Sequence, residues 1–202
     1  MSATIEYFYD VVSPNSYLAN RLLPAIAERH GATIRYVPML LGGVMKATNN
    51  KPPFVAFADC KPKMAYGQVE MARFIRKHQL TSFKMNPHFP MNSLLMMRAA
   101  AAAEMDGTLT EYIAAAERLT WEQGLKMDDA EVFAAGLTAE GLDGAALLAR
   151  TQEQAVKDRL IANTEQAVAR GCFGAPTYFV GEEMFFGKDR LVELEDELKR
   201  TR

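Results

Sequence analysis

The sequence predicts an α/β fold in which a small sheet is interrupted by a long all-helical insertion. Three observations support this fold class. Strand-like segments flank a helical segment near the N-terminus, helix-forming residues fill most of the centre of the chain, and a strand–turn–strand pattern followed by a helix closes the chain. The predicted order is therefore βαβ, a helical block, and ββα.

The N-terminal unit is predicted from hydrophobic periodicity. Residues Thr4–Tyr9 and Thr33–Pro38 are rich in β-branched and aromatic residues, so we expect two strands. Between them, apolar residues recur at spacings of three and four from Pro14 to about His30, and Gly31 supplies a stop signal. Two strands joined by one helix over so short a distance are typical of a βαβ unit with parallel strands.

The centre of the chain has a different character. Residues 42–53 are typical of a loop, because they contain two asparagines and a pair of prolines. Residues 61–171 are helix-forming almost throughout, and the breaks between their periodic segments predict five or six helices.

The β pattern returns near the C-terminus. Thr177–Val180 and Met184–Phe186 are expected to pair as a hairpin around a turn at residues 181–183. Asp189 is then expected to cap a closing helix that carries leucines on one face and basic residues at its end.

The composition argues against several classes of protein. The chain has 202 residues, of which 49% are hydrophobic and 24% charged, as in globular rather than disordered proteins. A formal net charge of −2 without basic clusters argues against a nucleic-acid or membrane-surface partner. No apolar run approaches the roughly 18 residues of a membrane span, and no targeting segment is predicted.

The use of cysteine indicates the compartment. Cys60 and Cys172 are the two cysteines of the sequence, and they are far apart and form no CxxC pair. Two isolated thiols fit a reducing compartment, so we expect a cytoplasmic protein. We predict no metal site.

A βαβ unit followed by an antiparallel hairpin and a terminal helix is the thioredoxin topology. The sequence therefore predicts a discontinuous thioredoxin-like domain formed by residues 1–50 and 170–202. Residues 51–169 are predicted to form a helical insertion domain between its two halves.

The Ser13–Pro14 junction is the first candidate site. Pro14 suits the first position of a helix, and Ser13 is then a natural N-cap, which is a purely structural role. The N-terminus of the helix after the first strand of this fold also stabilises a thiolate, and thioredoxin-fold oxidoreductases place a CxxC motif there. This chain has Ser13 and Ser16 at those spacings. Serine cannot exchange disulfides, but its hydroxyl can donate to the thiolate of another molecule.

The Ala175–Pro176 pair, just before the predicted hairpin, is the second candidate site. Thioredoxin folds place a cis-proline there, whereas an isolated X-Pro bond is usually trans, so the sequence leaves the isomer open. A cis bond would expose the backbone N–H and C=O of Ala175 to an extended peptide-like ligand such as glutathione.

Five collinear segments carry a resemblance to a known family. They are FYDVVSPNSYLA, IRYVPMLLGGVMKATNNKPP, KPKMAYGQVEMARF, the FP-N-S-x-x-x-x-R run from Phe89 to Arg98, and GCFGAPTYFVGEEMFFGKDRL. The sequence resembles the kappa-class glutathione transferases and, more closely, the bacterial 2-hydroxychromene-2-carboxylate isomerases. The five segments extend from the first predicted strand to the closing helix.

The resemblance implies a glutathione site. Ser13 is expected to be the catalytic residue and to hold the glutathione sulfur as a thiolate, while Ala175 and Pro176 receive the tripeptide backbone. The γ-glutamyl end is expected at the FGKD segment, which consists of Phe186, Gly187, Lys188 and Asp189. In that segment Asp189 would face the ammonium group of glutathione, in addition to capping a helix.

The resemblance also implies a neighbouring substrate site. Lys63 and Asn50 are expected to face the carboxylates of glutathione or of the substrate. From the residues alone, the alternative is that Lys63 is a solvated surface lysine and Asn50 a turn asparagine. Asn49 replaces the glycine that is usual in the family, and Phe185 and Phe186 replace tryptophans, which leaves the aromatic substrate open.

The activity implied by the resemblance is a glutathione-dependent cis–trans isomerisation of an aromatic-degradation intermediate, a hydroxybenzylidene-pyruvate-like compound. A kappa-class-like glutathione transferase or peroxidase is the alternative, since it would share the fold and Ser13. A non-catalytic glutathione-binding protein and a thiol–disulfide oxidoreductase are further alternatives, the latter opposed by the missing CxxC motif. Relatives are dimers, so a homodimer is expected.

Overall fold

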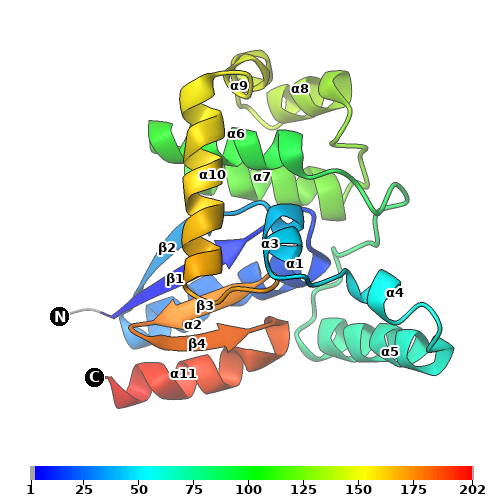
Figure 1. Cartoon of the computed structure of the whole chain (residues 1–202), viewed down its shortest axis with the longest axis vertical. Helices are drawn as coiled ribbons and strands as arrows, with labels where there is room; N and C mark the ends of the chain where they lie inside the picture. Colours follow the sequence, from blue (N-terminus) through cyan, green and yellow to red (C-terminus); the bar gives the residue numbers. More distant parts are fainter. Residues whose placement is uncertain (1–2, 202) are drawn as a thin grey trace.

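The computed structural model describes residues 3–201, and the strands in this range form one four-stranded sheet in the order β2-β1-β3-β4 (Figure 1). β1 (Thr4–Tyr9) pairs in parallel with β2 (Thr33–Pro38) and antiparallel with β3 (Thr177–Val180). β3 pairs antiparallel with β4 (Glu183–Phe186). The predicted α/β fold class is confirmed, and β4 begins one residue earlier than predicted.

Helices surround this sheet and make up the long segment between β2 and β3 (Figure 1). In residues 3–201, no helix is both long and apolar enough to span a membrane. The helices are α1 (Pro14–Asn20), α2 (Leu23–His30), α3 (Leu41–Ala47), α4 (Pro53–Ala56), α5 (Lys61–Lys77), α6 (Leu94–Asp106), α7 (Leu109–Trp121), α8 (Ala130–Ala139), α9 (Gly144–Arg150), α10 (Gln154–Ala169), the 3₁₀ helix η1 (Lys188–Arg190) and α11 (Leu191–Arg200).

The two faces of the sheet are covered by different helices. On one face the rings of Tyr9, Tyr7 and Tyr178 stack across β1 and β3, with centroids 5.4 and 5.2 Å apart, and pack in the core that includes α2, α6 and α11. On the other face Phe8 and Phe179 pack in the cluster that includes residues of α3 and α10. Figure 1 shows α10 crossing this face of the sheet.

The helix predicted from Pro14 to about His30 is broken in two. α1 ends at Asn20 and α2 begins at Leu23, with Pro24 in its first turn. Pro24 has no N–H to donate to the Asn20 carbonyl, and its ring collides with that carbonyl in a continuous helix. The apolar spacing predicted the buried face correctly, but Pro24 divides the helix that carries it.

The loop predicted at residues 42–53 is wrong for most of its length, because α3 and α4 form there. α3 contains two glycines, so its local helix propensity is low. Two backbone N–H groups at its start instead donate to the side chains of distant residues. The Leu40 N–H donates to the Thr164 hydroxyl at 3.0 Å, and the Leu41 N–H to the Asp10 carboxylate at 3.0 Å.

A buried carboxyl group lies between α7 and the end of α1. Glu117 on α7 is 1% exposed, and Asn20 donates to its Oε2 at 2.9 Å. Its Oε1 has no hydrogen-bond partner among the residues that the structure describes. Burial raises the pKa of Glu117 to about 8, so the group keeps its proton at neutral pH.

We expect Glu117 to make the protein less stable as the pH rises from about 4.5 to about 8. In this window the unfolded chain has released the proton and the folded chain still binds it, so unfolding is favoured by on the order of 1 kcal/mol per pH unit. Urea unfolding at pH 5.5 and 8 should show this fall, and Glu117→Gln should flatten it. Glu111→Gln, on the exposed side of the same helix, should keep it. An equal fall in Glu117→Gln would contradict a protonated Glu117.

The crossing of α8 and α9 leaves no room for a side chain at Gly144. A Cβ atom there would lie 2.0 Å from the Ala134 carbonyl oxygen, so Gly144→Ala should lower the free energy of unfolding by about 1–3 kcal/mol. Gly42→Ala is the matched control, because a Cβ atom at this position in α3 meets nothing within 4 Å. The control should be neutral or stabilise α3. Thermal unfolding followed by circular dichroism measures both, and similar effects of the two changes would contradict the close crossing.

Candidate active site at the start of the first helix

Ser13 caps α1, as the sequence predicts. Its backbone is extended (φ −81°, ψ 114°), and its Oγ accepts the Ser16 N–H at 3.2 Å. Pro14 occupies the first turn, where its missing N–H has no intrahelical partner to lose. α1 is only seven residues long, but the favourable field at a helix N-terminus acts mainly within its first turn. The break before α2 therefore leaves the N-terminal environment of Ser13 intact.

Asp10 anchors the loop between β1 and α1. Its carboxylate is fully buried and accepts three hydrogen bonds: from the Val12 N–H at 2.9 Å, the Leu41 N–H at 3.0 Å and the Ser93 hydroxyl at 2.7 Å. Burial raises the pKa of Asp10, and the three donors act in the opposite direction. The Asp10 main-chain carbonyl also accepts the Ser13 N–H at 3.0 Å.

Asp10 is not among the residues predicted for the site. The available signal was an acidic residue that directly follows a strand whose last residues are aromatic. Two of its three donors lie 31 and 83 residues away, so periodicity could not reveal them.

Ser13 and Ala175 are brought together from opposite ends of the chain. The Ser13 hydroxyl donates to the Ala175 carbonyl at 3.3 Å, and Ser13 is 5% exposed. The Ala175–Pro176 peptide bond is cis. Within residues 3–201, no acceptor is paired with the Ala175 N–H. A backbone donor is therefore free beside the hydroxyl of Ser13.

The segment around β4 packs against the residues before the cis-proline. The Gly187 N–H donates to the Pro176 carbonyl at 2.9 Å, which holds the FGKD segment beside Ala175. The Phe186 ring lies 4.4 Å from the Phe173 ring, centroid to centroid, and a Cβ atom on Gly174 would lie 2.7 Å from Phe186. Only glycine therefore fits at position 174 without a shift of Phe186.

Asn50 also reaches this segment. Its Nδ2 donates to the Phe173 carbonyl at 2.8 Å, and its Oδ1 accepts the Lys51 N–H at 2.8 Å. The structure thus places Asn50 beside the segment that contains Ala175, with the side chain bonded to backbone groups.

The prediction that Asp189 caps the closing helix is wrong. Asp189 lies inside η1, and α11 begins at Leu191 with Arg190 at its N-cap and no side-chain capping bond. The Asp189 carboxylate instead accepts from the Lys188 ammonium group at 2.8 and 2.9 Å. The Lys188 side chain is 8% exposed and lies over the Phe74 ring of α5, whereas 64% of the Asp189 side chain is exposed.

Lys63 is the predicted residue that lies apart from this group. It sits in the first turn of α5, and its ammonium nitrogen is 3.3 Å from the centroid of the Phe57 ring. This cation–π contact directs Lys63 towards α4. α5 reaches the FGKD segment through Phe74, about three turns further along the helix.

The two cysteines differ in exposure and in pKa. Cys60 is exposed before α5, and Cys172 is buried, with a pKa that burial raises to about 11. In the described part of the chain, no group of three or more His, Cys, Asp or Glu side chains could hold a metal ion.

The sequence matches the model of a known domain family. A family model described as a DSBA-like thioredoxin domain matches residues 4–199, which is nearly the whole chain. The chain belongs to this family. The predicted thioredoxin-like fold is thereby confirmed.

Individual relatives are similar over most of their length. The chain is 30% identical over 198 residues to the 2-hydroxychromene-2-carboxylate isomerase of Pseudomonas putida, covering 97% of this chain and 94% of the relative. It is 28% identical to human glutathione S-transferase kappa 1, covering 93% and 87%. A solved structure of a 2-hydroxychromene-2-carboxylate isomerase superimposes with a TM-score of 0.82 at 30% identity, covering 98% of this chain and 95% of that structure.

We expect Asp10 to be required for a stable site loop. Asp10→Asn replaces one of the two acceptor oxygens with a donor, which then faces another donor in a buried position. The free energy of unfolding should fall by about 2–4 kcal/mol. Asp158→Asn, the same change at an exposed carboxylate, should alter stability by no more than about 0.5 kcal/mol. Urea unfolding of both variants measures the difference, and a small effect at Asp10 would contradict its anchoring role.

Proposed function

We propose that the protein is a glutathione-dependent cis–trans isomerase that acts on open, conjugated aromatic carboxylates. Relatives named 2-hydroxychromene-2-carboxylate isomerase support an isomerase with an aromatic carboxylate substrate. The observation that carries the proposal is the placement of the Ser13 hydroxyl at the start of α1, 3.3 Å from the carbonyl of Ala175. Sequence identity of about 30% to three isomerases over nearly the whole chain supports the activity.

Ser13 is the proposed thiolate-holding residue. Its hydroxyl now donates to the Ala175 carbonyl, and rotation about the Cβ–Oγ bond redirects this proton to an incoming sulfur without moving Oγ. A hydrogen bond to the charged form lowers the pKa of a thiol, and the first-turn N–H groups of α1 act in the same direction. Glutathione would supply a sulfur nucleophile that adds reversibly to a conjugated carbon, which allows rotation about the former double bond.

The backbone beside Ser13 suits the tripeptide. The unpaired Ala175 N–H can donate to a ligand carbonyl, as one strand does to the next. The exposed Asp189 carboxylate is proposed to bind the γ-glutamyl ammonium group, and Lys188 holds that carboxylate in place. Phe186 and Gly187 form the remaining surface of this subsite, next to Pro176.

Asn50 and Lys63 are proposed to face carboxylates of glutathione or of the substrate. Asn50 is bonded to the Phe173 carbonyl and lies beside the segment leading to Ala175. Lys63 would leave the Phe57 ring to meet an anion, since a full charge attracts an ammonium group more strongly than an aromatic ring does.

A homodimer is part of the proposal. α4 and α5 have no buried residues in the single chain, although both carry large apolar side chains. These side chains are 37–58% exposed: Phe54, Val55, Phe57, Tyr66 and Val69. Such an apolar surface is suited to contact with a second copy.

A kappa-class-like glutathione transferase is the second candidate function. The 28% identity to human glutathione S-transferase kappa 1 favours it, because the same Ser13 geometry would serve a reaction that consumes glutathione. Quantifying free glutathione over many turnovers separates the two functions. An isomerase returns glutathione unchanged, whereas a transferase depletes it by one equivalent for each product formed.

We expect Ser13→Ala to reduce isomerase kcat/KM by about 10²–10³-fold, because one hydrogen-bond donor to a reacting anion is lost. The pKa of bound glutathione, followed through the ultraviolet absorbance of its thiolate, should rise in the same variant. Ser16→Ala is the matched control on the same helix, because the Ser16 hydroxyl is buried and has no partner among the described residues. If Ser13→Ala leaves both the activity and the thiol pKa unchanged, Ser13 does not hold the thiolate.

A further inference from the structure

A groove outside the candidate active site lies between α10, α3 and α6. Its volume is about 430 Å³, which falls within the range of sites for small organic molecules, about 300–1,000 Å³. The wall is apolar over most of its length, formed by Leu40, Leu94, Leu160, Ile161 and Val168. None of the residues assigned to the proposed glutathione site lines it.

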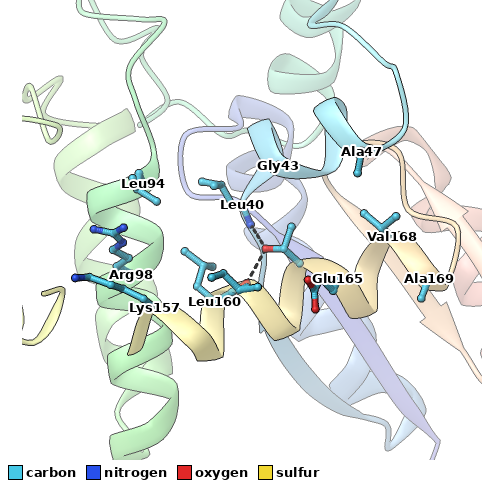
Figure 2. A pocket seen from close by; sticks show the side chains of 12 residues that line it. Leu40, Gly43, Ala47, Leu94, Arg98, Lys157, Leu160, Glu165, Val168 and Ala169 are labelled. Atoms are coloured by element: carbon cyan, nitrogen blue, oxygen red, sulfur yellow. Dashed lines mark hydrogen bonds between the residues drawn. The ribbon is translucent and has the colours of Figure 1, made fainter. Parts of the chain in front are cut away.

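Two basic side chains stand together at one end of this groove. Figure 2 shows Arg98 of α6 beside Lys157 of α10, with Glu165 further along α10. Both basic residues are half-buried. In the part of the chain that the structure describes, neither side chain has a hydrogen bond or ion pair with another residue.

Arg98 is the more unusual of the two. α6 is otherwise an alanine-rich helix in which residues 99–103 are fully buried, so a guanidinium group there loses part of its hydration. Desolvation of a cation is unfavourable unless an anion or several acceptors compensate it. The sequence places this arginine in one of the five collinear segments, yet the proposed glutathione reaction gives it no role.

The shape of the groove limits the ligand. Its lining runs along α10 from Lys157 to Ala169, which corresponds to about 18 Å of helix. The cations lie at one end only, and the rest of the wall is apolar apart from Thr164 and Glu165. The Thr164 hydroxyl already accepts the Leu40 N–H and donates to the Leu160 carbonyl. Such a wall suits an elongated hydrocarbon with a single anionic head.

We propose that this groove binds an elongated apolar carboxylate of the medium-chain fatty-acid type. The planar guanidinium of Arg98 pairs with the carboxylate through two parallel N–H donors, and Lys157 adds a second positive charge. The hydrocarbon lies along Leu40, Leu160 and Val168. This site is independent of the proposed function, because it uses no residue of the glutathione site.

Calorimetric titration with octanoate tests the proposal on the full chain, with octanamide as a neutral ligand of the same shape. One octanoate should bind per chain, at least about tenfold more tightly than octanamide, because a charge-assisted hydrogen bond contributes more than a neutral one. Arg98→Gln or Lys157→Gln should weaken octanoate binding about tenfold and leave octanamide binding unchanged. Arg159→Gln is the matched control, since it removes a charge from the exposed side of the same helix outside the groove.

A second set of variants locates the bound carboxylate. Ile161→Asp places a negative charge on an exposed part of the groove wall and should weaken octanoate binding, whereas Lys63→Gln and saturating glutathione should not. The proposal is overturned if octanoate does not bind, if it binds no better than octanamide, or if Arg159→Gln weakens it as much as Arg98→Gln. Loss of binding in Lys63→Gln alone would place the ligand near α4 and α5 and would equally overturn it.

Discussion

The buried carboxylate of Asp10 is the interaction on which the arrangement around Ser13 depends. A carboxylate without water must be met by hydrogen-bond donors, and here they come from the loop before α1, the first residue of α3 and the residue before α6. None of these segments can move away without leaving the carboxylate short of a donor. The Ser13 N–H donates to the main-chain carbonyl of Asp10. Asp10 therefore also holds the residue that carries the proposed thiolate-holding hydroxyl.

α3 links the two sites proposed for this chain. Leu40, just before it, lines the groove and donates to Thr164 of α10, while the next N–H along the chain donates to Asp10. The start of α3 therefore rests on α10 on one side and on the Asp10 anchor on the other. Its far end leads to Asn50, which is bonded to the segment before Ala175.

The sequence predicted the parts of the fold that depend on local pattern. The strands follow from runs of β-branched and aromatic residues, and the Ser13 cap from the Ser-Pro junction, since both signals lie within a few neighbouring residues. The break at Pro24, the helix over Leu41–Ala47 and the position of Asp189 in η1 were missed. At the start of α3, hydrogen bonds to distant side chains decide the structure, and single-sequence periodicity carries no information about them.

The order of the strands has a consequence for synthesis on the ribosome. β1 lies between β2 and β3, so one of its two neighbours comes from the last 26 residues of the 202-residue chain. Proteins emerge from the ribosome with the N-terminus first, and the helices between β2 and β3 leave the exit tunnel while one edge of β1 is still unpaired. A nascent chain that stalls before Thr177 lacks β3, the strand that follows Ala175 and Pro176, however completely its helices have formed.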